Sequence, residues 1–145
     1  MNVLIKQLSK DKIFHFLQKV DSCFIPFPLS KRVNLKLYSE KLADCAIHFL
    51  IEFDNQLIGM CCCYMNDPKI ERVFLSIICL NPDYHRMGLG KILLHECELY
   101  ANKNGFIFIE LEVNVENSPA IEMYKVMGYS IDRQEKESFF MKKLL

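Results

Sequence analysis

A glycine-containing segment between a strand pattern and a helix pattern constrains the fold of this chain more than any other feature. Residues 72–80 form an apolar, β-branched run, residues 81–91 read Asn-Pro-Asp-Tyr-His-Arg-Met-Gly-Leu-Gly-Lys, and residues 92–100 have helical spacing. At the start of a helix the backbone N–H groups point outward and the helix dipole adds positive charge. Glycines there allow close approach of an anion. The segment therefore predicts a phosphate site, and we expect a pyrophosphate as its ligand.

Two familiar phosphate-binding motifs do not describe this segment. A Walker loop places four residues before its Gly-Lys-Ser/Thr triplet, but here a single residue separates Gly88 from Gly90. A dinucleotide fingerprint needs a further glycine three residues later, where this chain has Leu93. The alternatives that remain are a different kind of phosphate site or a helix start that binds no ligand.

Two patterns together resemble one protein family. Residues 85–90 (His-Arg-Met-Gly-Leu-Gly) resemble the Gln/Arg-x-x-Gly-x-Gly/Ala acetyl-CoA signature of the GNAT superfamily of N-acetyltransferases. Residues 111–129 resemble the second signature of that family, which is a strand, an Asn, a short helix carrying a Tyr, and a Gly followed by an aromatic residue. Asn117 and Tyr124 have the spacing of that signature. The resemblance covers nearly the whole chain from Val3 onward.

The resemblance implies a fold and an activity. The fold would be a single α/β domain over residues 1–145, with a central twisted mixed sheet and helices on both faces. The activity would be transfer of an acetyl group from acetyl-CoA to a primary amine by direct attack within a ternary complex. The elements that we expect are strands at 3–8, 47–53, 57–65, 72–80, 106–113 and 139–144 and helices at 11–20, 33–45, 89–103 and 119–126. A turn is expected at Asp67-Pro68.

The resemblance also implies the residues that bind the donor. The glycine segment would hold the pyrophosphate of acetyl-CoA mainly through its backbone, and the end of the preceding strand would bind the pantetheine arm as an added strand would. His85 stands where the signature usually has Gln or Arg, and Arg86 and Lys91 either add charge or face solvent. The donor-binding residues implied are Ile78, Cys79, Leu80, His85, Arg86, Met87, Gly88, Leu89, Gly90, Lys91, Asn117, Ala120 and Tyr124.

Tyr124 is the residue that we expect to act as general acid. Expulsion of coenzyme A gives a thiolate, whose thiol form has a pKa of about 8.5, and a tyrosine of pKa about 10 can donate a proton to it if its hydroxyl lies close to the sulfur. The alternative is a tyrosine that only packs, because Ile121, Tyr124 and Met127 share one face of a short helix.

A general base is also required, since an alkyl amine is mostly protonated at neutral pH. Glu112 matches the position of a glutamate proposed as base in the ribosomal-protein alanine N-acetyltransferases, which this segment resembles. Strand alternation places Glu112 on one face with Glu110, so a solvated face is the alternative. Residues 73–80 offer no carboxylate, and Ser76 is their only polar side chain, so a water relay is a further alternative.

The acceptor should meet residues 24–29, the first two helices and the strand hairpin. Phe24, Phe27 and Tyr38 are candidates for an acceptor pocket, although buried aromatic residues are more often part of a core. We expect a small-molecule amine, such as an amino sugar or amino acid derivative. Two alternatives are a protein N-terminus and a catalytically silent module that binds acyl-CoA.

Composition limits the other partners. Lys plus Arg and Asp plus Glu each number 18, so the net charge is zero, and without a basic stripe no nucleic-acid partner is expected. The longest apolar run, residues 57–65, is too short to span a membrane, and no leader pattern is seen, which favours the cytoplasm. The seven cysteines lack zinc-site spacing, so we expect no metal and read them as buried apolar residues. A monomer or homodimer is expected.

Overall fold

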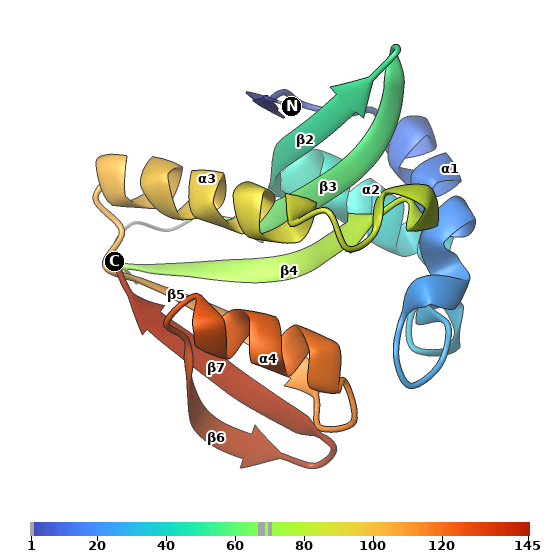
Figure 1. The fold of residues 1–145 in the computed structure, drawn as a ribbon. Coiled ribbons are helices and arrows are strands. Elements are labelled where there is room, and N and C mark those ends of the chain that lie inside the picture. Colours follow the sequence, from blue (N-terminus) through green and yellow to red (C-terminus); the bar gives the residue numbers. More distant parts are fainter. Residues whose placement is uncertain (1, 67–68, 70) are drawn as a thin grey trace.

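The computed structural model describes residues 2–66, 69 and 71–145, and the elements in these ranges build one seven-stranded sheet with four α-helices (Figure 1). Along the chain the elements are β1 (Val3–Ile5), α1 (Lys10–Val20), α2 (Leu35–Cys45), β2 (Ile47–Phe53), β3 (Gln56–Tyr64), β4 (Arg72–Leu80), α3 (Leu89–Lys103), β5 (Phe108–Asn114), α4 (Ser118–Val126), β6 (Ser130–Glu135) and β7 (Ser138–Leu144). Short 3₁₀ turns lie at Asp21–Cys23, Leu29–Lys31 and Pro82–Tyr84. The expected turn at Asp67-Pro68 lies outside the described residues.

The sheet order is β1-β2-β3-β4-β5-β7-β6, and within it only β4 and β5 run parallel. Strands β2 and β3 join through a two-residue turn at Asp54 and Asn55, both of which have a positive φ. This is the backbone that a tight hairpin requires, and Asp and Asn tolerate it better than most residues. The mixed α/β sheet expected from the sequence is confirmed.

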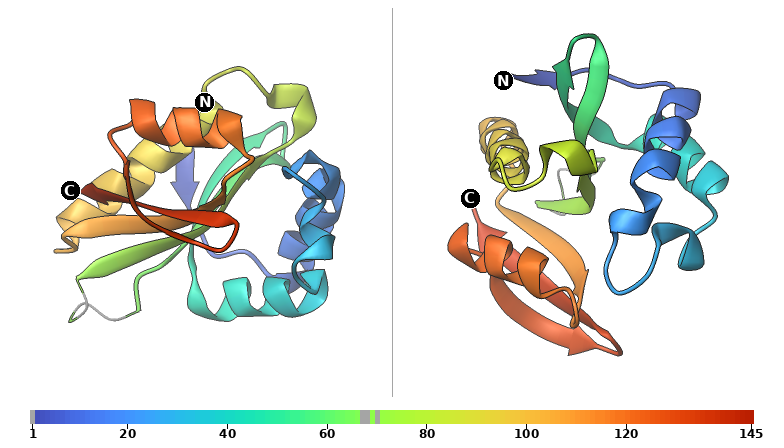
Figure 2. Two further views of the ribbon diagram at one scale, coloured as in Figure 1. Left: turned by 90° about the horizontal axis from the view of Figure 1, so that it is seen from below. Right: turned by 45° about the vertical axis from the view of Figure 1, so that its right-hand side comes forward.

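Helices cover both faces of the sheet (Figure 2). Helices α1 and α2 pack on one face in a cluster that includes Leu17 and Leu42. Helices α3 and α4 pack on the other face in a cluster that includes Leu93 and Ile121. Because strand side chains alternate, each inner strand feeds both clusters.

Capping separates α3 from the other α-helices of the described residues. Side-chain oxygens of Ser9, Asn34 and Asn117 accept backbone N–H groups at the starts of α1, α2 and α4. Helix α3 begins after Gly88 with no side-chain cap. Its first N–H groups are therefore left for solvent or a ligand.

Two expected strand boundaries differ from the structure by two or more residues. Strand β1 ends at Ile5 rather than residue 8, and β5 begins at Phe108 rather than residue 106. The sequence did not predict β6 at all, because every one of its side chains is exposed and Ser-Ile-Asp-Arg-Gln-Glu has no apolar alternation. β6 forms because its backbone pairs with β7. In the described part of the chain no helix has both the length and the hydrophobicity needed to cross a bilayer.

Candidate active site

A β-bulge in β4 opens the sheet where the site lies. Cys62 of β3 pairs with Ile77 and Cys63 pairs with Leu75, so Ser76 is an extra residue without a partner on β3. The bulge reverses the alternation, because Leu75 belongs to the core under α3 and α4 whereas Ile77 belongs to the core under α1 and α2.

The same position ends the pairing between β4 and β5. Their parallel register runs from Arg72 opposite Phe108 to Leu75 opposite Leu111 and goes no further. Beyond it, β5 continues beside β7 while β4 continues beside β3. The edge of β4 that faces β5 is therefore open from residue 76 onward, and an extended ligand can occupy it as an added strand would.

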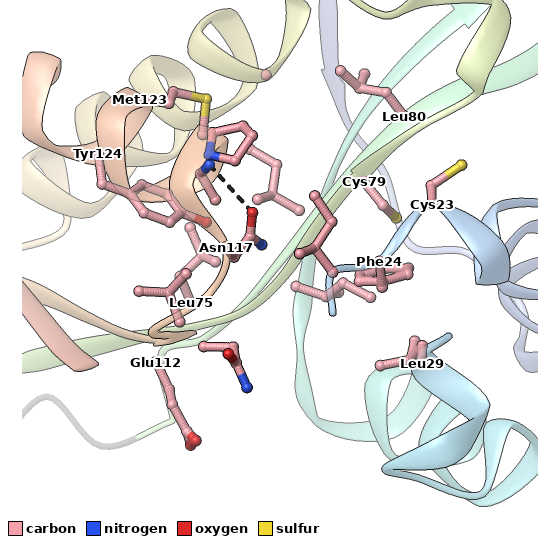
Figure 3. A pocket seen from close by; sticks show the side chains of 18 of the residues that line it. Cys23, Phe24, Leu29, Leu75, Cys79, Leu80, Glu112, Asn117, Met123 and Tyr124 are labelled. Atoms are coloured by element: carbon pink, nitrogen blue, oxygen red, sulfur yellow. Dashed lines mark hydrogen bonds between the residues drawn. The ribbon is translucent and has the colours of Figure 1, made fainter. Parts of the chain in front are cut away.

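A cavity of about 640 Å³ fills the space between the separated strands. Its walls come from the loop after α1, from α2, from the ends of β4 and β5, and from the starts of α3 and α4. The lining residues are Cys23, Phe24, Ile25, Leu29, Arg32, Tyr38, Leu75, Ser76, Ile77, Ile78, Cys79, Leu80, His85, Arg86, Gly90, Glu112, Val113, Asn114, Asn117, Pro119, Ala120, Met123 and Tyr124. Figure 3 shows Tyr124, Asn117 and Met123 on one side of this cavity and Phe24 and Leu29 on the other.

The glycine segment adopts the backbone of an anion site. Gly88 has φ +74°, in the left-handed region that favours glycine, and it directly precedes α3. Gly90 lines the cavity with its backbone, and a Cβ there would lie 3.4 Å from Met123 Sδ. The uncapped N–H groups of α3 therefore open beside the cavity, and their binding of a phosphate stays a prediction.

Residues of the segment divide between the cavity and other surroundings. His85 and Arg86 line the cavity, and His85 Nε2 lies 3.0 Å from the carbonyl oxygen of Leu80. Leu89 is buried in the core, whereas Met87 is 55% exposed and Lys91 is exposed. Ile78, Cys79, Leu80, Asn117, Ala120 and Tyr124 also line the cavity, as implied by the family resemblance. The donor-binding role of each remains a prediction.

Tyr124 lies on α4 with its ring in the core and its hydroxyl directed towards the middle of the cavity (Figure 3). Burial raises the pKa of Tyr124 above the ordinary tyrosine range, and the nearby Cys61 and Cys63 act in the same direction. The hydroxyl has no hydrogen-bond partner among the described residues. Tyr124 therefore stays protonated at neutral pH and its proton is free for a ligand.

Asn117 holds the helix that carries Tyr124. Its side-chain oxygen accepts the Ala120 N–H at 3.4 Å, and its backbone carbonyl accepts the Ile121 N–H at 3.0 Å. Asn117 is therefore the N-cap of α4. Since Asn117 also lines the cavity, it positions α4 at the cavity wall.

The two carboxylates that share a face of β5 have different surroundings. Glu110 is buried and pairs with Arg133 at 3.2 Å and Arg72 at 3.7 Å. Glu112 is exposed, lines the cavity, and points away from the Tyr124 hydroxyl in Figure 3. Glu110 is therefore a structural residue, whereas Glu112 is the carboxylate from β5 that can meet a bound ligand.

The expected acceptor residues also divide. Phe24 and Tyr38 line the cavity, but Phe27 is not among its lining residues and is 38% exposed. Ser76 and Arg32 also line the cavity, and the sequence analysis did not assign them to the site. One sequence feature could have indicated Ser76, because it is the only polar side chain within residues 73–80. No sequence feature indicated Arg32.

The geometry agrees with the comparison to known families. The model of the acetyltransferase (GNAT) family matches residues 14–129, which is most of the chain, and the chain therefore belongs to this family. The family resemblance of the two sequence signatures is thereby confirmed.

Curated relatives extend beyond the length of this chain. The chain is 31% identical over 110 residues to "Probable N-acetyltransferase san" of Drosophila melanogaster, covering 74% of this chain and 58% of that protein. It is 30% identical over 142 residues to an uncharacterised N-acetyltransferase of Methanocaldococcus jannaschii, covering 92% and 61%. It is 28% identical over 116 residues to N-alpha-acetyltransferase 50 of Danio rerio, covering 78% and 67%. The chain thus spans about three fifths of the first two relatives.

Experimental structures share the fold across the whole chain. The PaiA N-acetyltransferase of Thermoplasma acidophilum, crystallised with coenzyme A, has a TM-score of 0.80 at 20% identity, with 100% of both chains covered. The ribosomal-protein-S18-alanine N-acetyltransferase of Escherichia coli has a TM-score of 0.78 at 19% identity, covering 99% of this chain and 94% of that one. At these identities the likeness concerns the fold alone.

Proposed function

We propose that this chain is an N-acetyltransferase that moves an acetyl group from acetyl-CoA to a primary amine. One observation carries the proposal: the open edge of β4, the uncapped start of α3 and the Tyr124 hydroxyl meet in one cavity. The start of α3 suits the pyrophosphate of the donor, and the open strand edge suits the two amides of its pantetheine arm. Membership of the acetyltransferase (GNAT) family supports the same donor.

In the proposed mechanism the amine attacks the thioester carbonyl carbon directly. The tetrahedral intermediate that results expels the thiolate of coenzyme A, and the Tyr124 hydroxyl donates the proton that the thiolate takes up. Burial raises the pKa of Tyr124, so the hydroxyl still carries its proton at neutral pH when the thiolate forms beside it.

Glu112 is the proposed base. The attacking amine must lose one proton before attack and a second as the intermediate collapses. Since the Glu112 carboxylate lies at the cavity but points away from Tyr124, we propose that a water molecule carries the proton between the amine and Glu112. Separating the acid from the base in this way keeps the two proton transfers on different sides of the thioester.

The proposed acceptor is a small molecule that carries its primary amine next to an apolar group. Phe24, Ile25 and Leu29 supply an apolar wall, and the loop that carries them is closed by Asp21, which accepts the Ser30 N–H at 2.8 Å and the Ser30 hydroxyl at 2.6 Å. A closed loop of this kind suits a compact acceptor. Among the described residues that line the cavity, Glu112 is the one carboxylate, so they form no acidic cluster that would favour a polycation.

A protein N-terminus is the second candidate acceptor. Two of the similar proteins are named as acetyltransferases of an alpha-amino group or of a ribosomal-protein alanine. A peptide would place its α-amine at the thioester and its first side chain against the same apolar wall.

A thiol-release assay over an amine panel, paired with calorimetric titration of acetyl-CoA, tests the proposal. The panel holds amino sugars, amino acid amides and short peptides with apolar first residues. Turnover of the small amines supports the proposed acceptor, and turnover of peptides alone supports the second candidate. Acetyl-CoA binding without turnover of any amine would indicate an acyl-CoA-binding module, and no binding would refute the proposal.

We also propose a reducing compartment, the cytoplasm, as the location, and a monomer or homodimer as the active form. All seven cysteines are unpaired and five of them are buried, which suits a reducing environment. No nucleic-acid or membrane partner is proposed, since the net charge is zero.

A further inference from the structure

Three cysteine side chains from two elements meet in the core under α3. Cys63 Sγ lies 2.9 Å from Cys97 Sγ and 3.8 Å from Cys61 Sγ, and all three sulfur atoms lie within 4.8 Å of one another. Each of the three residues is fully buried. We call Cys61, Cys63 and Cys97 the trithiol cluster.

The fold builds this cluster from a sequence pattern that did not predict it. Cys61, Cys62 and Cys63 are consecutive on β3, so alternation sends the outer two to the α3 face and Cys62 to the opposite face. Cys97 lies on the buried side of α3 and completes the cluster. Sequence spacing indicated no metal site, because Cys97 lies on α3, far along the sequence from Cys61 and Cys63.

One of the three sulfur separations already matches that of two ligands bound to a single atom. Metal–sulfur bonds of about 2.3 Å arranged in a plane put the sulfur atoms roughly 4 Å apart. The cluster already has one separation of 3.8 Å and none above 4.8 Å. The Cys63–Cys97 separation of 2.9 Å is shorter than this and would have to widen on binding.

The ligand set selects the kind of ion. All three donors are sulfur, and soft thiolate ligands select Cu(I), zinc and iron–sulfur centres. Zinc takes a fourth ligand, either a protein side chain or a water. Within the described residues no His, Asp or Glu joins the cluster, and its complete burial leaves no room for solvent at the metal. Cu(I) is stable with three sulfur ligands.

We propose that the trithiol cluster is a binding site for one Cu(I) ion in three-coordinate sulfur ligation. Because the thiolate is the metal ligand, the binding step exchanges three protons for the ion: three thiol S–H bonds break, three Cu–S bonds form, and the protons leave to solvent, with no change of oxidation state.

The proposed ion would lie behind one wall of the candidate active site. Tyr124 belongs to the same core cluster as the three cysteines, and its hydroxyl lies on the cavity side. The site is thus separate from the cavity, and its occupancy can be measured without any assay of acetyl transfer.

The test uses the full chain with Cys23→Ala and Cys45→Ala, which removes the two thiols that solvent reaches. The protein is reduced with a phosphine, unfolded and refolded with Cu(I) under anaerobic conditions, and then titrated against a chromophoric Cu(I) chelator. Refolding with the ion removes burial as a barrier to entry. We expect one Cu(I) per chain and an X-ray absorption spectrum with sulfur neighbours alone at about 2.3 Å.

Adjacent residues of β3 supply a matched pair of variants. Cys62→Ala and Cys63→Ala remove the same sulfur from neighbouring, fully buried positions, but only Cys63 belongs to the cluster. We expect Cys63→Ala to weaken Cu(I) binding by roughly tenfold or more and Cys62→Ala to retain it. Thermal unfolding of both metal-free variants verifies that they fold, and Cys97→Ala replaces Cys63→Ala if the latter does not.

Three results would each overturn the proposal. These are no Cu(I) retained against the chelator, equal loss of binding in the two variants, and nitrogen or oxygen neighbours in the absorption spectrum. Preference of the refolded protein for Zn(II) over Cu(I) in the same competition would overturn it as well.

Discussion

The Tyr38 hydroxyl lies 2.6 Å from Ser76 Oγ and 3.3 Å from the Ser76 carbonyl oxygen, which ties α2 to the bulged residue of β4. A carbonyl oxygen only accepts, so the consistent assignment has Tyr38 donating to the carbonyl and the Ser76 hydroxyl donating to Tyr38. At Ser76 the alternation of β4 reverses and its pairing with β5 ends. This pair of hydrogen bonds therefore stabilises the opening of the sheet that forms the cavity.

Tyr38→Phe should lower both stability and activity. The variant leaves the Ser76 carbonyl without its donor, and we expect a loss of about 1–3 kcal/mol in the free energy of unfolding. Urea denaturation of Tyr38→Phe, Ser76→Ala and the double variant measures the coupling. Additive losses would show that the two hydroxyls do not act together.

Gly88→Ala should weaken acetyl-CoA binding as well as stability. Alanine at φ +74° costs about 1–2 kcal/mol, although no atom lies within 4 Å of the added Cβ. Gly105→Ala is the control, because Gly105 has φ +87° and equally open surroundings at the other end of α3.

Chemical denaturation should give similar losses for the two glycine variants. Calorimetric titration with acetyl-CoA should show weaker binding for Gly88→Ala alone. Equal affinities of the two variants for acetyl-CoA would show that the glycine segment does not bind the donor.

Glu112→Gln should slow acetyl transfer if this carboxylate receives protons from the amine. We expect a fall in kcat of about 10²- to 10⁴-fold. Glu116→Gln makes the same change of charge at an exposed residue outside the cavity lining. Similar rates of acetyl transfer in both variants would show that Glu112 is a solvent-exposed surface residue and not the base.

Acid should destabilise the fold through His48. The Leu8 N–H donates to His48 Nδ1 at 2.9 Å, so Nε2 carries the proton and donates to the Leu42 carbonyl at 2.7 Å. Burial lowers the pKa of His48 in the folded protein, although the bond to Leu42 opposes this. Below pH 6.5, the pKa of an ordinary histidine, His48 binds a proton in the unfolded chain but stays neutral in the folded chain.

Above that pH, the contribution of His48 to the free energy of unfolding should therefore not change with pH. Below it, the free energy of unfolding should fall as the pH drops towards the lowered pKa of His48 in the folded protein. The expected loss is about 1.4 kcal/mol per pH unit across this window. Urea midpoints measured across the window should fall in the parent and in His15→Gln, which changes an exposed histidine. His48→Gln should flatten the dependence, and an unchanged slope in that variant would assign it to other groups.

Local patterns in the sequence predicted most of the elements that position the site. The glycines at 88 and 90 indicated the start of α3, and the spacing of Asn117 and Tyr124 indicated the helix that follows β5, because each pattern acts on its own neighbours. β6 escaped prediction because its pairing with β7, rather than any burial of side chains, makes it a strand.

Features that depend on register could not be read from the chain. The bulge at Ser76 appears only when β3 and β4 are aligned, and it decides which side chains of β4 face the cavity. The trithiol cluster likewise requires α3 to cross β3 at Cys97. Both arise from packing between distant segments, for which a single sequence has no local signal.

The rate of acetyl transfer by Tyr124→Phe, measured at saturating acetyl-CoA on an amine that the wild-type chain turns over, tests the proposed mechanism most directly. Phenylalanine keeps the buried ring and removes only the hydroxyl that is directed towards the cavity. We expect kcat to fall about 10²- to 10⁴-fold while the calorimetric affinity for acetyl-CoA stays the same. A wild-type rate in the variant, under conditions where the chemical step limits turnover, would contradict a role for Tyr124 as the acid.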